Sequence, residues 1–165
     1  MKNIRIKAFF FITVLFCSHI VVNAQYQPKN ISAADLQKAN QWVDKTYQSL
    51  SQDEKLGQLF IVALYTNKGE DHINSVRNII INDKIGGLIL MQDDAAREIN
   101  LVNEFQKKSK IPLMIGMDAE WGLFQRIATA HKFPWAMTLG AIQDKSLITE
   151  MAAKIAEDCK RIDIN

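Results

Sequence analysis

Two acidic residues and an arginine stand where a parallel α/β fold would place a ligand. Asp118 and Glu120 directly follow the apolar run 112–117, and Arg126 comes eight residues after Asp118. If that run is a strand of a parallel sheet, Asp118 lies at its carboxyl end, which faces the ligand crevice in such folds. Carboxylates and guanidinium groups form strong charge-assisted hydrogen bonds, so this pair is suited to holding the hydroxyl groups of a polyol.

The same two carboxylates are poorly placed to cleave a glycosidic bond between them. That reaction needs two carboxyl groups that flank the bond. Asp118 and Glu120 are two residues apart on one extended segment, so they approach from the same side. We interpret Asp118 as a binding group. The alternative, that Asp118 caps a turn of the loop and Glu120 is simply solvated, stays open at this point.

The elements that must position this segment alternate between strand and helix. The apolar runs 59–65, 88–91 and 112–117 predict three strands, the first of them buried on both faces and the third starting with Pro112. Helical spacing predicts helices over 31–50, between the strands, and after Asp144. The inner stripes of the last three helices are Ile73, Val76 and Ile80; Ala95, Ile99, Val102 and Phe105; and Leu147, Met151 and Ile155.

Several residues mark where these elements begin and end. Ser51 and Glu54 have the spacing of a capping box, and Asp93 or Asp94 is expected to cap the helix that follows the second strand. Gly86 and Gly87 are expected to end the preceding helix and to allow a close strand approach. The last four residues, 162–165, resemble the start of a fourth strand.

Strands spaced about 25 residues apart with helices between them predict a parallel sheet. Either an open, doubly wound sheet or part of a closed barrel satisfies this pattern. No Gly-x-Gly-x-x-Gly follows a strand, so a dinucleotide-binding fold has no support. A complete eight-stranded α/β barrel needs about 250 residues, more than this chain has.

The first 24 residues predict a cleaved secretion signal. Lys2, Arg5 and Lys7 precede the apolar stretch 8–22, which is short for a membrane span of about 20 residues, and 22–24 offers small-residue cleavage chemistry. Without residues 1–24, which hold these three bases and no acidic residue, the remaining 141 residues hold 17 basic and 18 acidic groups, a net charge of −1. Near neutrality excludes a nucleic-acid binder that works through bulk positive charge.

The histidines and cysteine of the remaining chain are interpreted as structural. His72 near a helix start and His131 in the loop after Arg126 are expected to be solvated, and Cys159 to be a small core residue. These residues lie in separate elements, so no metal site is expected. Trp121 and Trp135 could stack on a sugar or pack against the fold, and both alternatives stay open. Gln92, at the end of the second strand, is a further candidate for lining the site.

The segment Asp118–Arg126 resembles the Asp-x-Glu-Gly/Trp-Gly segment of family 3 glycoside hydrolases, in particular the bacterial β-N-acetylhexosaminidase branch. The resemblance covers about residues 40–165, and four other pieces support it in order: Leu56–Phe60, Gly86–Gln92, Phe133–Gly140 and Cys159–Arg161. Many members have Glu-Gly-Gly where this chain has Glu120-Trp-Gly122. The resemblance implies that Asp118 and Arg126 bind the sugar on the non-reducing side of the scissile bond.

The resemblance also implies a fold and an activity. We expect a signal peptide (1–24), a lead-in helix (25–50) and a partial barrel domain (51–165): an α/β fold with about three βα units and the start of strand four of a TIM (β/α)8 barrel. The implied reaction is retaining hydrolysis of terminal β-linked N-acetylhexosamine, EC 3.2.1.52. The alternatives are a β-glucosidase and a small non-catalytic α/β sugar-binding domain.

The expected partners follow from the same resemblance. The substrate is a carbohydrate derived from peptidoglycan or another glycan, with no nucleic acid, cofactor or metal, and no stable membrane anchor after signal cleavage. The location is periplasmic or extracellular.

The expected site residues also follow from it. The substrate-binding candidates are Asp118, Arg126 and Gln92. The family's nucleophile and acid/base residue lie after the fourth strand, which here means beyond Asn165, the last residue of the sequence. No catalytic residue is therefore expected within the 165 residues, and the chain itself is expected to be inactive.

Overall fold

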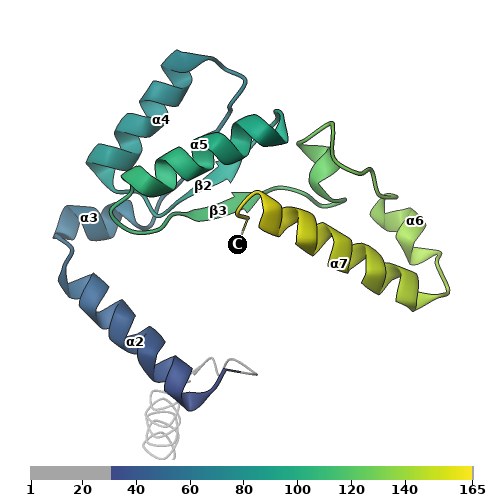
Figure 1. The fold of residues 1–165 in the computed structure, drawn as a ribbon, viewed down its shortest axis with the longest axis horizontal. Helices are drawn as coiled ribbons and strands as arrows, with labels where there is room; N and C mark the ends of the chain where they lie inside the picture. Colours follow the sequence, from purple (N-terminus) through teal and green to yellow (C-terminus); the bar gives the residue numbers. More distant parts are fainter. Residues whose placement is uncertain (1–30, 165) are drawn as a thin grey trace, which may run out of the picture. The chain divides into compact units, whose positions relative to one another are not determined.

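The computed structural model describes residues 31–164 (Figure 1). The expected signal peptide lies outside these residues, as does Asn165, the last residue of the expected fourth-strand start. The boundary between two units of the chain lies between Asp44 and Lys45. No helix in the described part of the chain is long and apolar enough to cross a membrane.

Helix α2, Ala33–Gln48, confirms the helix expected near 31–50, but its apolar stripe is not part of a core. None of its residues is buried, and Trp42, Val43 and Tyr47 are each more than half exposed. The capping box that follows is confirmed at α3, Gln52–Gly57: the Ser51 hydroxyl accepts from the Glu54 amide, and the Glu54 carboxylate accepts from the Ser51 amide.

The three expected strands form one parallel sheet in the order β1–β2–β3. They are β1, Ile61–Leu64; β2, Gly87–Leu90; and β3, Met114–Met117. Each differs at one or both ends from the apolar run that predicted it, and β3 ends at Met117 as predicted. Pro112 lies outside β3, because pairing with β2 begins at Met114, opposite Gly87.

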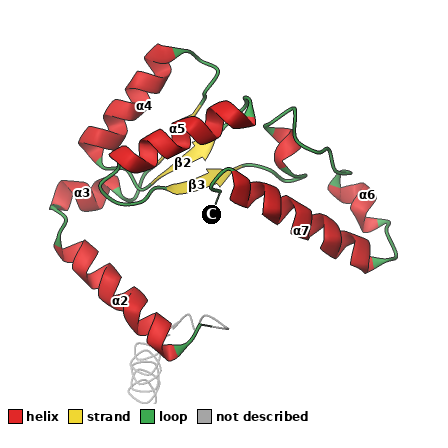
Figure 2. Cartoon of the chain, in the orientation of Figure 1, coloured by secondary structure: helices red, strands yellow, loops and turns green. Residues whose placement is uncertain are grey.

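Both connecting helices, α4 (Glu70–Asp83) and α5 (Ala95–Lys108), lie on the same side of the sheet (Figure 2). A doubly wound sheet needs a reversal of strand order that sends helices to the opposite face. The described strands run in sequence without such a reversal. Consecutive βα units of a barrel have this arrangement, and one half of a doubly wound sheet shares it, so the described strands fit both arrangements that the sequence allowed.

The hydrophobic core lies between this side of the sheet and the two helices. Its strand residues include Leu64, Leu88 and Ile115, each 0% exposed. The helices contribute the predicted stripes: Ile73, Val76 and Ile80 from α4, and Val102 and Phe105 from α5. Burial of one such aliphatic side chain contributes about 1.5–3 kcal/mol, so this layer supplies most of the stabilisation of the sheet.

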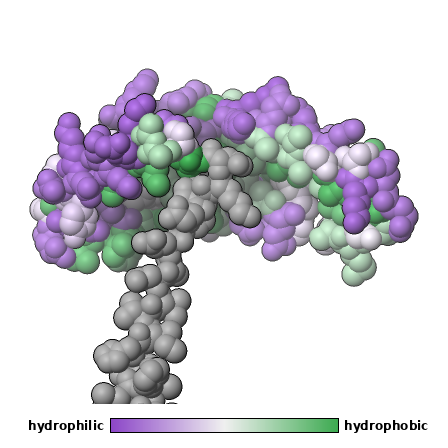
Figure 3. All heavy atoms as spheres, turned by 90° about the horizontal axis from the view of Figure 1, so that it is seen from below, coloured by the Kyte–Doolittle hydropathy of each residue, from purple (hydrophilic) through white to green (hydrophobic). Residues whose placement is uncertain are grey.

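The other side of the sheet is partly open, which corrects the expectation of a first strand buried on both faces. The register places Ile61, Gly87 and Met114 side by side on the face away from the core. Ile61 is 57% and Met114 60% exposed, and Leu59 before β1 is 78% exposed. Figure 3 shows hydrophobic residues, in green, at the surface among hydrophilic ones.

Close backbone packing explains the glycines at the start of β2. A Cβ on Gly87 would lie 2.4 Å from the Met114 carbonyl oxygen, which confirms the expected close approach. The expected helix stop lies elsewhere: α4 ends at Asp83, and Lys84 takes the left-handed conformation (φ 52°). Lysine in place of glycine there carries a conformational cost that the surrounding packing offsets.

The segment after β3 contains the short helices η1 (Leu123–Gln125) and α6 (Ala136–Gly140) and the long helix α7 (Lys145–Arg161). Asp144 caps α7 as predicted, accepting from the Ser146 amide at 2.9 Å. The expected stripe of α7 is only partly covered: no α7 residue is buried, although Ile155 packs against the core.

Residues 162–164 form a turn, so the expected start of a fourth strand is wrong for these residues. Asp163 is left-handed (φ 62°), and the amides of Asp163 and Ile164 donate to the carbonyls of Lys160 and Cys159 at 3.4 and 3.0 Å. These two bonds are those of a Schellman cap, which satisfies the carbonyls at the end of α7. Ile162 is buried beneath this turn, so its apolar side chain packs at the end of α7 and does not belong to a strand.

Candidate functional site

The predicted polar pair comes together at the carboxyl end of β3. Asp118 directly follows Met117, the last residue of β3, in a loop drawn green in Figure 1. The Arg126 guanidinium donates from Nη2 to Oδ2 of Asp118 at 2.5 Å and from Nε to the Asp118 carbonyl oxygen at 3.0 Å. Arg126 thus forms hydrogen bonds to both the side chain and the backbone of Asp118.

The side chains of Arg126 and Asp118 differ in their exposure to solvent. The Arg126 side chain is 15% exposed and that of Asp118 is 45% exposed. The guanidinium is therefore enclosed and fixed, while the carboxylate that it orients remains open to solvent. A pre-oriented, accessible carboxylate can accept hydrogen bonds from ligand hydroxyls without first losing side-chain freedom.

The loop that carries the pair is anchored by a glycine turn and by a 3₁₀ helix whose Leu123 is buried. Gly122 has φ +85°, and a Cβ there would lie 3.0 Å from the Phe133 ring. Leu123 and Ile127, on either side of the turn that leads to Arg126, are 5% and 1% exposed. Because these anchors bury apolar surface beneath the loop, the position of Arg126 is set by packing as well as by its ion pair.

Glu120 and Gln92 do not join this pair in the described residues. Glu120 is exposed, and its amide donates to the side-chain oxygen of Gln125 at 2.7 Å. Gln92 is exposed two residues after β2. The sequence indicated its neighbour Asp93 only as a candidate helix cap. In the structure Asp93 accepts from the Thr66 hydroxyl at 2.5 Å and so links the loops that follow β1 and β2.

The two tryptophans of the loop stack on each other. Their ring centroids are 4.9 Å apart and the rings are inclined by 10°. Trp121 is half-buried, whereas Trp135 is 58% exposed. Packing and ligand stacking were open alternatives for these residues; the structure shows that one face of each ring is used for the pair.

A buried carboxyl group on α5 was not predicted from the sequence. Glu98, in the first turn of α5, is 0% exposed, and neither carboxyl oxygen has a hydrogen-bond partner among the described residues. Burial, followed by the charges of Asp93 and Asp94, raises the pKa of Glu98 to about 8. The available signal was its spacing, four residues before Val102 on the inner stripe.

The remaining candidates have structural environments. His72 is half-buried rather than solvated, because its Nε2 accepts from the Tyr65 amide at 3.0 Å. His131 is exposed as expected, with its ring edge against Phe133. Cys159 packs against the core, and burial raises the pKa of its thiol. Within residues 31–164 no group of three metal-ligating side chains is found.

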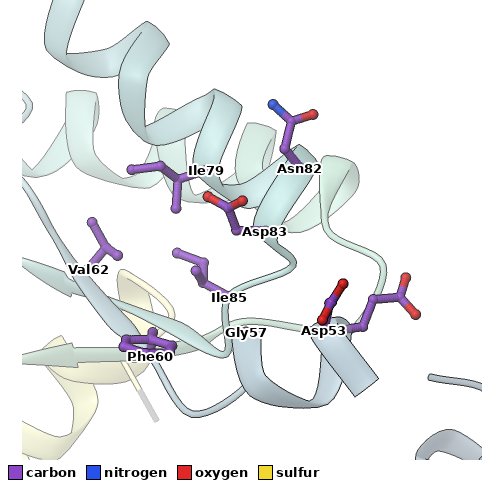
Figure 4. A pocket seen from close by; sticks show the side chains of 9 residues that line it. Asp53, Gly57, Phe60, Val62, Ile79, Asn82, Asp83 and Ile85 are labelled. Atoms are coloured by element: carbon purple, nitrogen blue, oxygen red, sulfur yellow. The ribbon is translucent and has the colours of Figure 1, made fainter. Parts of the chain in front are cut away.

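A cavity of about 590 Å³ lies at the opposite end of the sheet from Asp118. Figure 4 shows it between α3, the beginning of β1 and the end of α4. Phe60 and Ile85, which line it, stand just before β1 and β2. Ligand sites of parallel α/β folds lie at the carboxyl ends of the strands, so this cavity at the amino ends is not the candidate site.

Comparison with known proteins connects the site to a family. Residues 51–165 match the model of the glycosyl hydrolase family 3 N terminal domain. The chain belongs to glycosyl hydrolase family 3. The matched region contains the whole Asp118–Arg126 loop. Sequence resemblance had indicated the same family.

Family 3 relatives are considerably longer than this chain. A protein of Cellulomonas fimi named beta-N-acetylglucosaminidase/beta-glucosidase is 29% identical over 124 residues, 75% of this chain and 21% of the relative. The structure of a beta-glucoside phosphorylase, BglX, bound to 2FGlc has 25% identity and a TM-score of 0.64, covering 85% of this chain and 24% of that one. A second BglX structure, 24% identical, has a TM-score of 0.59 and covers 85% and 23%, a likeness of fold alone.

The catalytic residues of the family stay a prediction for this protein. The nucleophile and the acid/base residue are expected beyond Asn165, and Asn165 itself lies outside the described residues. The described residues contain the loop from Asp118 to Arg126, in which Arg126 donates to the carboxylate and to the carbonyl oxygen of Asp118.

Proposed function

We propose that this chain supplies part of the sugar-binding face of an exported, retaining family 3 glycosidase that removes terminal β-linked N-acetylhexosamine. Family membership and the name of the Cellulomonas relative support the reaction class. The sequential strand order and the likeness to BglX support the assignment of the three strands to a (β/α)8 barrel. The basic residues and apolar stretch of the first 24 residues support export.

The proposal rests mainly on one observation: Arg126 forms hydrogen bonds to the carboxylate and the carbonyl oxygen of Asp118 at the end of β3. In the proposed complex the Asp118 carboxylate accepts hydrogen bonds from hydroxyls of the terminal sugar. Hydrogen bonds to a charged group contribute about 1.5–3 kcal/mol each. The nucleophile and the proton donor, which must flank the bond, belong to residues beyond Asn165, so the 165-residue chain alone is expected to give no turnover.

Two other activities are kept as alternatives because comparisons favour them. The name of the Cellulomonas relative includes beta-glucosidase, and the BglX structures are named as a beta-glucoside phosphorylase. A β-glucosidase would differ from the proposed enzyme in the terminal sugar that it accepts. A phosphorylase would transfer that sugar to inorganic phosphate instead of water. A non-catalytic sugar-binding domain would bind the sugar without turnover.

The test measures kcat/KM of the complete protein that carries this sequence. The substrates are an aryl N-acetyl-β-glucosaminide and an aryl β-glucoside, each with and without inorganic phosphate. We expect hydrolysis of the glucosaminide, and Asp118→Ala to lower its kcat/KM at least about 10- to 100-fold. Glu120→Gln, which changes an exposed carboxylate two residues away, is the matched control and is expected to have little effect.

The two catalytic alternatives have their own signatures in this test, and a non-catalytic sugar-binding domain would turn over none of the substrates. Preference for the glucoside supports the β-glucosidase, and phosphate-dependent release of a sugar phosphate supports the phosphorylase. Near-wild-type kinetics of Asp118→Ala in a folded protein would show that Asp118 has no role in substrate binding.

A further inference from the structure

The stacked tryptophans form a flat aromatic surface in the same loop as the sugar-binding pair. We propose that the open indole face of Trp135, backed by Trp121, is a platform for a second sugar ring, the one next to the terminal sugar held by Asp118. This inference rests on the proposed function. It adds a subsite and a preference for a glycan over a simple glycoside.

The loop holds Trp121 rigidly behind the platform. Before it, the Glu120 amide donates to Gln125; after it, the Gly122 amide donates to the Ala119 carbonyl at 3.0 Å. Gly122 has φ +85°, and a Cβ there would lie 3.0 Å from the Phe133 ring, so this turn accepts a larger residue poorly. A backing ring that is already fixed costs little further entropy when a ligand stacks on its partner.

Chain connectivity keeps the platform near Asp118. Trp121 is three residues after Asp118, and three residues span at most about 11 Å even when fully extended. The Trp135 ring lies directly on that of Trp121, at the 4.9 Å centroid distance. In the proposed complex, a ligand whose terminal ring meets the Asp118 carboxylate places its next ring against the indole pair.

Within the described residues, the outer face of the pair is accessible. Trp135 is 58% exposed although Trp121 covers one of its faces, so the opposite face contributes to that exposed surface. Large aromatic side chains are more often buried than exposed, and aromatic residues combined with a few polar groups are typical of ligand sites. A pyranose ring suits such a surface because its C–H face is apolar and its hydroxyls are polar, and the indole N–H is a hydrogen-bond donor.

The experiment compares a glycoside that has one sugar ring with one that has two. For the complete protein, kcat/KM is measured for methyl N-acetyl-β-glucosaminide and for N,N′-diacetylchitobiose; methyl β-glucoside and cellobiose are measured in parallel. We expect Trp135→Ala to lower kcat/KM for the disaccharide about 3- to 10-fold, the worth of one aromatic stacking contact, and to leave that of the methyl glycoside within about twofold.

Matched variants separate the platform from general effects. Trp135→Leu keeps apolar bulk but removes the flat face, so it is expected to behave like Trp135→Ala. Met137→Ala removes another exposed apolar side chain, 90% exposed, and is expected to change neither substrate. Asp118→Ala is expected to lower kcat/KM for both substrates. An equal effect of Trp135→Ala on both substrates, or none on either, would overturn the platform.

A binding measurement keeps this test separate from the proposed activity. The sequence has three tryptophans, so for this chain in a Trp42→Phe background only the stacked pair reports fluorescence. We expect N,N′-diacetylchitobiose to change this fluorescence and N-acetylglucosamine to change it much less. If no substrate is hydrolysed but this difference remains, the proposed activity fails and the platform stands. If hydrolysis occurs and the fluorescence responds equally to both sugars, the platform fails alone.

Discussion

Two amphipathic helices of similar length, α5 and α7, differ in how their apolar faces are used. Helix α5 buries Glu98, Val102 and Phe105 against the sheet. Helix α7 has a comparable stripe but no buried residue, and Leu147 near its beginning is 52% exposed. The difference teaches that the same periodic pattern stabilises a fold only where a facing layer is present, because hydrophobic stabilisation follows the area removed from water.

The largest expected effect tests this contrast directly. Phe105→Ala removes a ring that is 0% exposed and is expected to lower the free energy of unfolding by about 3–5 kcal/mol. Leu147→Ala truncates a half-exposed side chain on α7 and is expected to change the free energy of unfolding by less than about 0.5 kcal/mol. Urea titrations of the two variants measure both values. Similar losses would mean that α7 is as firmly packed as α5.

A second prediction concerns the unpartnered carboxyl within the packed region. Because the pKa of Glu98 is about 8 in the folded state, against an ordinary value of 4.5, the unfolded chain releases this proton at a lower pH than the folded chain does. The free energy of unfolding should therefore fall as pH rises from about 4.5 to about 8 and then level off. Glu98→Gln should remove this slope and stabilise the protein at pH 8 by on the order of several kcal/mol.

The control for Glu98 lies on α7. Hydrogen bonding to Lys154 lowers the pKa of Glu157, which therefore loses its proton below this pH window in both states. Glu157→Gln should leave the slope between about pH 5 and 8 unchanged. Thermal unfolding at several pH values measures the slopes, and parallel curves for wild type and Glu98→Gln would contradict the role of Glu98.

The smallest effect compares the caps of the two helices. Asp94 accepts from the amides of Ala96 and Arg97 at the start of α5, and Asp144 accepts from the Ser146 amide at the start of α7. Asp94→Ala is expected to cost about 1 kcal/mol of global stability. Asp144→Ala should instead increase amide hydrogen exchange in the first turn of α7, with a smaller global loss, because that turn opens locally. Equal global losses would show that both helices unfold with the core.

Sequence reasoning succeeded where local chemistry dominates. The three strands, the stripes of α4 and α5, and the caps Ser51, Asp94 and Asp144 follow from periodicity and from short-range hydrogen bonds. The placement of Asp118 at a strand end follows from the same reading. Patterns within a few residues carry this information because helix and strand periods and cap bonds are themselves local.

Sequence reasoning failed where the outcome depends on distant neighbours or on competition between local bonds. The apolar run 59–65 does not reveal that Ile61 faces away from the helix layer, and a glutamate on an inner stripe does not reveal its degree of burial. The apolar residues after α7 predicted a strand. Instead, the amides of Asp163 and Ile164 donate to carbonyl groups at the end of α7 and are not free to pair with another strand.

For this protein the sequence by itself determined the order of strands and helices and the presence of a carboxylate and an arginine after β3. Only the tertiary structure decided that Arg126 holds Asp118, that Trp135 stacks on Trp121, and that both helices lie on one face of the sheet. The physical reason is distance along the chain. Elements form through bonds between near neighbours, whereas these contacts require a loop to close around buried apolar residues, and that closure depends on the packing of the whole sheet.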